Sequence, residues 1–151
     1  MKTLEKTVIK NVNATQERIF NQILRWDMTR EKEYLKNKQG YIDSDYLNQM
    51  ELEYKKFVFL MTLYTDKVLP ISENIDDMWH IHVLNTKRYA KFCVEATERL
   101  IHHNPTVNEQ ENLDLMPQYI GNTLPLYEKH FGKPIKEFWL NIGAGGACCT
   151  H

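Results

Sequence analysis

Apolar side chains recur at helical spacing between Tyr46 and Tyr64, and this segment sets the expected fold class. Successive positions of the stripe are three or four residues apart, and further apolar residues widen it. The stripe consists of Tyr46, Met50, Tyr54, Phe57, Met61 and Tyr64. A stripe this wide is typical of a core helix rather than of a ligand surface. The segment therefore predicts a central helix that is capped by Asp43 or Ser44.

Helical patterns also occur on both sides of this segment. One begins at a Thr15 cap and ends before Gly40, with a potential interruption near residue 28. Others cover residues 73–100, 112–131 and 135–142, and Pro117, Gly121 and Pro125 predict that the third of these forms in pieces. No alternation of β-branched residues is present. We therefore expect an all-α fold, a single-domain irregular bundle of about five to six helices over residues 1–142.

Length and charge exclude several classes of partner. The chain of 151 residues fits one domain. Its 19 basic and 20 acidic side chains give a net charge of −1, and no basic block occurs, so we expect no nucleic-acid partner. No segment approaches the roughly 18 apolar residues of a membrane span, and no apolar run of signal-peptide length opens the chain. We expect a cytoplasmic protein that does not bind membranes.

Four of the six histidines lie between residues 70 and 105, in two close pairs. His80 and His82 are two positions apart, which is roughly 200° around a helix, so they should point away from each other. Asp76 or Asp77, four or three positions before His80, can share a metal ion with the imidazole or orient the ring. The second pair, His102 and His103, follows about twenty positions later.

The two histidine pairs can meet only if the chain turns back between them. Asn85 and Thr86 can end one helix and start a second, with Thr86 as its cap and an end near Leu100. Pro105 then biases the preceding residue towards an extended backbone. A single continuous helix would instead hold the pairs about 30 Å apart. A shared site therefore depends on a break in this helix.

The Trp79-His80-x-His82 motif is followed by His102-His103-x-Pro105, and with its flanking positions this pattern resembles the glycine-rich domain-containing protein family of plants and bacteria. The flanking positions are Tyr54, Phe57, Pro70, Ile71, Ser72, Ile75, Asp76, Leu84, Thr86, Tyr89, Phe92 and Cys93. The resemblance covers roughly the central third to half of the chain, and the Gly- and Cys-containing tail agrees with the family name. Because this family is largely uncharacterised, the resemblance implies a shared site and no particular activity.

Residues 143–151 form a Gly- and Ala-rich tail that ends in Cys148-Cys149-Thr150-His151. Such a segment buries little surface by itself, so we expect it to be flexible. Its thiols and imidazole are ligands that suit zinc, copper or iron. Because two adjacent cysteines rarely bind one ion together, at most one of them is expected to act with His151.

These features lead to a first hypothesis, a transition-metal site for zinc, iron or copper. Its ligands would come from His80 or His82, from His102 or His103, from Asp76 as a ligand or an orienting group, and from a tail cysteine with His151. The alternative is that the histidines and Asp76 form a structural network of hydrogen bonds. Asp76, Asp77 and Glu73 are candidate general bases, but no nucleophile, phosphate-binding or dinucleotide motif accompanies them, so enzymatic activity is left open.

Two further hypotheses concern the tail. In one, the protein is a non-catalytic helical module whose tail docks on a protein or peptide partner. In the other, Gly145-Gly146 marks the boundary between a helical leader and a short, modified core peptide that contains Cys148 and Cys149.

Overall fold

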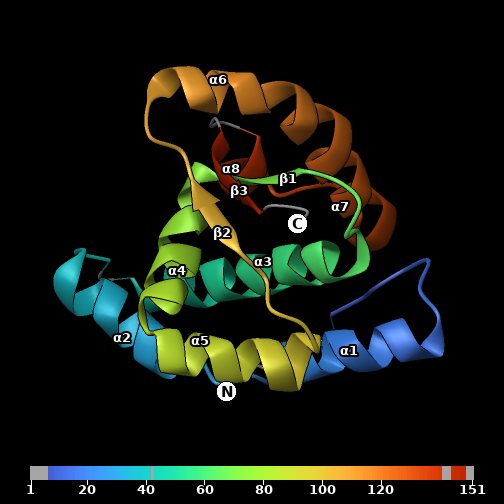
Figure 1. The fold of residues 1–151 in the computed structure, drawn as a ribbon. Helices are drawn as coiled ribbons and strands as arrows, with labels where there is room; N and C mark the ends of the chain where they lie inside the picture. Colours follow the sequence, from blue (N-terminus) through green and yellow to red (C-terminus); the bar gives the residue numbers. More distant parts are fainter. Residues whose placement is uncertain (1–6, 42, 141–143, 149–151) are drawn as a thin grey trace.

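Helix α3 (Ser44–Leu63) crosses the middle of the molecule (Figure 1) and carries the predicted apolar stripe. The computed structural model describes residues 7–41, 43–140 and 144–148. Met50, Tyr54 and Phe57 are fully buried on α3, which confirms that it is a core helix. The Asp43 side chain accepts hydrogen bonds from the first backbone N–H groups, so the predicted cap is confirmed as well.

Two helices, α1 (Ala14–Leu24) and α2 (Thr29–Lys38), precede α3. The cap of α1 is Asn13, which exchanges side-chain and backbone hydrogen bonds with Gln16. The prediction of Thr15 as the cap was therefore wrong: the helix begins earlier, and Asn13 is as good a capping residue as threonine. The interruption that we considered is real, and α2 starts where Asp27 accepts a hydrogen bond from the backbone N–H of Thr29.

The histidine-containing segment is broken into α4 (Glu73–Leu84) and α5 (Thr86–Phe92). Asn85, not Thr86 as predicted, caps α5 by accepting a hydrogen bond from the backbone N–H of Arg88. Helix α5 continues into a π-helical turn, Cys93–Thr97, which ends at Glu98 in the left-handed conformation. The break at Asn85 and this second turn lead the chain back along α4.

Three short strands form a small sheet that the sequence analysis did not predict. They are β1 (Leu69–Ser72), β2 (His103–Pro105) and β3 (Ala144–Cys148), and β3 lies in the centre, antiparallel to both neighbours. The expectation of a flexible tail is thus corrected for residues 144–148. Glycine and alanine supply no alternating pattern, but their backbone N–H and C=O groups pair on both sides.

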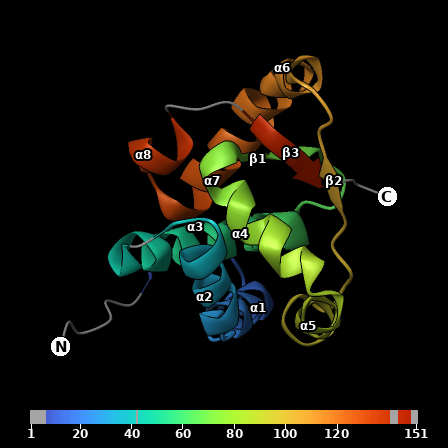
Figure 2. The ribbon, with the colours of Figure 1, turned by 90° about the vertical axis from the view of Figure 1, so that its left-hand side faces the viewer.

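The remaining helices are α6 (Glu109–Gln118), α7 (Leu124–Phe131) and α8 (Lys136–Trp139), with a π-helical turn at Tyr119–Thr123 between the first two. The prediction that this segment forms in pieces is thus only partly met: the hydrogen-bond pattern changes at the π-helical turn, but the backbone stays helical from Glu109 to Phe131. Figures 1 and 2 show α1, α2 and α5 on one side of α3, and the sheet with α6, α7 and α8 on the other. The predicted all-α, single-domain class is confirmed, with the small sheet as an addition. In the described ranges, no helix combines the length and the apolar character that crossing a membrane requires.

Candidate functional site

Asp76 on α4 and His103 on β2 form a carboxylate–histidine pair. Their Oδ1 and Nε2 atoms are 2.7 Å apart. The side chain of His103 is only 4% exposed, and that of Asp76 is 22% exposed. The ring of His103 also packs against the indole of Trp79, with 4.0 Å between the ring centroids. Contacts on two sides therefore fix the orientation of the His103 imidazole.

His80 lies beside this pair. It is exposed and one helical turn after Asp76, and its ring centroid is 6.3 Å from that of His103. The second ring nitrogen of His103, Nδ1, makes no hydrogen bond within the described part of the chain. The bonded pair of Asp76 and His103 and the separate ring of His80 therefore lie near one another where α4 passes β2.

His82 occupies the opposite side of α4, as its spacing from His80 predicted. It is fully buried, and its Nδ1 is 2.8 Å from the hydroxyl of Tyr54. The rings of Tyr89 and Phe92 enclose it. Burial is the main cause that lowers the pKa of His82 to about 4, so the ring is neutral at pH 7. His82 does not join the Asp76–His103 pair.

The other predicted ligands fall into three groups. His102 is exposed, and within the described residues it makes no hydrogen bond or ring contact with the pair. Cys148 lies on β3, where its Cα is paired with those of His103 and Leu69. Cys149 and His151 lie outside the described residues. The backbone register thus brings the end of the described chain to His103.

No three His, Cys, Asp or Glu residues in the described ranges are grouped closely enough to hold a metal ion. Asp77, a candidate base by sequence, accepts a hydrogen bond from the hydroxyl of Tyr41. Burial, together with this carboxylate, raises the pKa of Tyr41. The sequence analysis predicted Tyr54 only as a core residue and did not predict its hydrogen bond to His82. An apolar stripe gives no information about the partner of a tyrosine hydroxyl.

Fold and site together define a class: an all-α domain with a small antiparallel sheet and a carboxylate–histidine pair at the sheet edge. A family model described as UCP032817-like matches residues 15–115, which is 101 of the 151 residues. The chain belongs to the UCP032817-like family. No curated protein and no solved structure matches the chain. The match includes His80 and His103 and does not bear on the resemblance to the glycine-rich family, which stays a prediction.

Proposed function

We propose that this domain binds a divalent transition-metal ion where α4 passes β2, with His80 and His103 as ligands. The observation that carries this proposal is the 6.3 Å between the two ring centroids. A zinc–nitrogen bond of about 2 Å puts the ion about 3 Å from each ring centre, so two rings can share an ion at up to roughly 6 Å. In a tetrahedral arrangement the two ring centroids would be about 5 Å apart. His80 is exposed, so its side chain can rotate to shorten the 6.3 Å between the centroids to this distance.

Asp76 is assigned the role of orienting His103. A histidine that binds a metal usually donates its other N–H to a carboxylate, which fixes the tautomer and makes the metal-binding nitrogen more basic. The 2.7 Å contact involves Nε2 of His103. Nδ1 would then be the nitrogen of His103 that is left to bind the ion.

Two histidines leave two of the four positions of a zinc coordination shell to other donors. The pairing of Cys148 with His103 in the register of β2 and β3 favours donors from the end of the chain. We therefore assign the further ligands to the segment that contains Cys148, Cys149 and His151. Thiolate with imidazole is a donor set that suits zinc, and also iron or copper.

Elemental analysis of the purified full-length chain tests this proposal, and we expect about one zinc ion per chain after reconstitution. The Asp76→Asn variant should bind zinc roughly 10–100-fold more weakly. His80→Ala and His103→Ala should weaken binding at least as much, because each removes a ligand. His102→Ala is the matched control, and we expect it to bind zinc like the unmutated chain. An unmutated chain without stoichiometric zinc, iron or copper would overturn the proposal.

Single substitutions in the tail test the source of the further ligands. Cys148→Ser, Cys149→Ser and His151→Ala preserve the backbone pairing of β3, which a deletion would remove. At least one of them should lower zinc affinity. If none does, the tail supplies no ligand.

A second candidate function is a helical interaction module in which the histidines are structural. It is favoured because His82 and His103 both have hydrogen-bond partners without an ion. In that case His103→Ala should lower the free energy of unfolding equally with and without a chelator. The tail would then be free for a partner or for modification, and the intact mass of the native protein would reveal the latter.

A further inference from the structure

A pocket of about 380 Å³ lies between α2 and the junction of α4 and α5. Helix α2 contributes Arg30, Glu31 and Tyr34 to its lining, and Ile81, Leu84 and Lys87 come from the other two helices. The volume is at the lower end of the roughly 300–1,000 Å³ that is typical of small-molecule sites. None of the proposed metal ligands lines this pocket, so it is a separate site.

Two large side chains of the pocket wall are exposed to solvent, and a ligand in the pocket would pack against them. Tyr34 is 45% exposed and Leu84 is 61% exposed, while Ile81 beside them is buried. The wall therefore combines an aromatic ring with aliphatic surface. Such a wall favours a flat, apolar ligand body.

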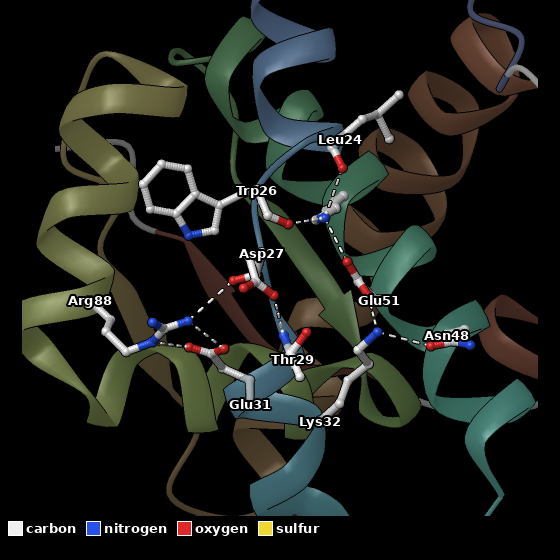
Figure 3. A network of polar contacts seen from close by, with 10 residues as sticks. Leu24, Trp26, Asp27, Thr29, Glu31, Lys32, Asn48, Glu51 and Arg88 are labelled. Carbon is white, nitrogen blue, oxygen red and sulfur yellow. Dashed lines mark hydrogen bonds and ion pairs between the residues drawn. The ribbon is translucent and has the colours of Figure 1, made fainter. Parts of the chain in front are cut away.

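The acidic residue of the pocket does not give it a negative charge. Glu31 is buried, and both of its carboxylate oxygens accept hydrogen bonds from Arg88, at 2.8 and 3.1 Å. Arg88 also donates to the backbone carbonyl of Asp27 (Figure 3). This paired arrangement joins α5 to α2 and holds one wall of the pocket in place.

Two positive charges of the pocket are uncompensated. Arg30 and Lys87 are exposed, and neither makes a hydrogen bond or an ion pair within the described ranges. They come from different helices, so a ligand in the pocket can contact both. Because Glu31 is neutralised by Arg88, the electrostatic preference of the pocket is for an anion.

We propose that this pocket binds a small aromatic anion, such as an aromatic carboxylate or sulfonate. Tyr34, Ile81 and Leu84 contact the ring system. Arg30 and Lys87 bind the anionic group.

Binding of 1-anilinonaphthalene-8-sulfonate to the full-length chain tests this site, because the probe is both aromatic and anionic. We expect saturable binding of about one probe per chain, and the Arg30→Gln/Lys87→Gln double variant should bind about tenfold more weakly. The matched control is Lys38→Gln/Lys91→Gln, which removes the same charge from exposed positions of α2 and α5 outside the pocket. It should bind like the unmutated chain.

Two measurements separate this site from unspecific adsorption. The uncharged probe N-phenyl-1-naphthylamine should bind at least about tenfold more weakly than the sulfonate. Amide shifts in a nitrogen-15 spectrum of the complex should concentrate at Tyr34, Leu84 and Lys87. Binding that does not saturate, equal affinity of the two double variants, equal affinity of the two probes, or shifts at other residues would each overturn the assignment.

Discussion

Replacing Lys55 with methionine is expected to lower the free energy of unfolding by about 3 kcal/mol. The ammonium group of Lys55 donates to the carbonyls of Leu24 and Trp26, at 2.9 and 2.5 Å, and to the carboxylate of Glu51, at 2.6 Å. Its three donors thus have three acceptors. The side chain is only 4% exposed, and burial lowers the pKa of Lys55 while Glu51 opposes this shift.

The expected loss of stability is large because Lys55 binds backbone carbonyls at the C-terminal end of α1. The last carbonyls of a helix have no partner inside it, and a cation near them is favourable. Helix α1 has no basic residue in its last turn, so Lys55 supplies this cation from α3. Figure 3 labels Leu24, Trp26 and Glu51, the three residues whose oxygen atoms accept hydrogen bonds from Lys55. Methionine keeps the apolar stem but leaves both carbonyls without their donor, at about 1–3 kcal/mol each.

Urea unfolding followed by circular dichroism measures this loss, since a change in stability shifts the midpoint. Glu51 keeps Lys32 as a partner, at 2.7 Å, so the loss comes mainly from the two carbonyls. Lys91→Met, at an exposed position of α5, is the control and should change stability by less than about 0.5 kcal/mol. A similarly small change in Lys55→Met would show that the contact does not stabilise the fold.

The helices could be predicted because their signals are local. The apolar stripe of α3 repeats every three or four residues, and Asn85 is a helix-capping residue beside a threonine that can also cap, so the break between α4 and α5 could be placed within one residue. The sheet could not be predicted in this way. β3 is defined by pairing with β1 and β2, which lie far from it in sequence, and its glycine and alanine residues have no alternating pattern.

The candidate site could be predicted only in part for the same reason. Helical geometry separates His80 from His82, but it does not decide which of His102 and His103 turns towards α4. Neighbouring residues of an extended chain point to opposite sides, so the register of β2 makes this choice. The pocket was missed altogether. Glu31 and Arg88 are 57 positions apart, and nothing in the local sequence of α2 marks Glu31 as buried.

Lowering the pH from 7.5 to 5 is expected to reduce the free energy of unfolding by about 2 kcal/mol through His82 alone, and by about 3 kcal/mol at pH 4. The pKa of this histidine falls from an ordinary 6.5 to about 4 in the folded chain. The unfolded chain therefore binds a proton more readily over this range. The stability linked to the neutral ring is complete above pH 6.5 and is lost as the pH falls from 6.5 to 4.

The pKa of His82 is lowered by its surroundings on the buried face of α4. Protonated His82 would carry a charge among the rings of Tyr54, Tyr89 and Phe92, where it is desolvated. Glu31 favours the charged form, but this effect is smaller than that of burial. His130 also has a lowered pKa, chiefly because of its burial, and it acts in the same direction. A variant that changes only His82 is therefore needed.

Urea unfolding of His82→Gln between pH 7.5 and 5, in the presence of a chelator, isolates the contribution of His82. Glutamine can accept the hydrogen bond of Tyr54 but does not titrate, so the loss of stability over this range should be about 2 kcal/mol smaller than in the unmutated chain. The comparison uses the slope with pH, so a lower stability of the variant at pH 7.5 does not affect it. His102→Gln, at an exposed position, should keep the unmutated slope. Equal slopes in His82→Gln and the unmutated chain would mean that the buried imidazole does not limit stability in acid.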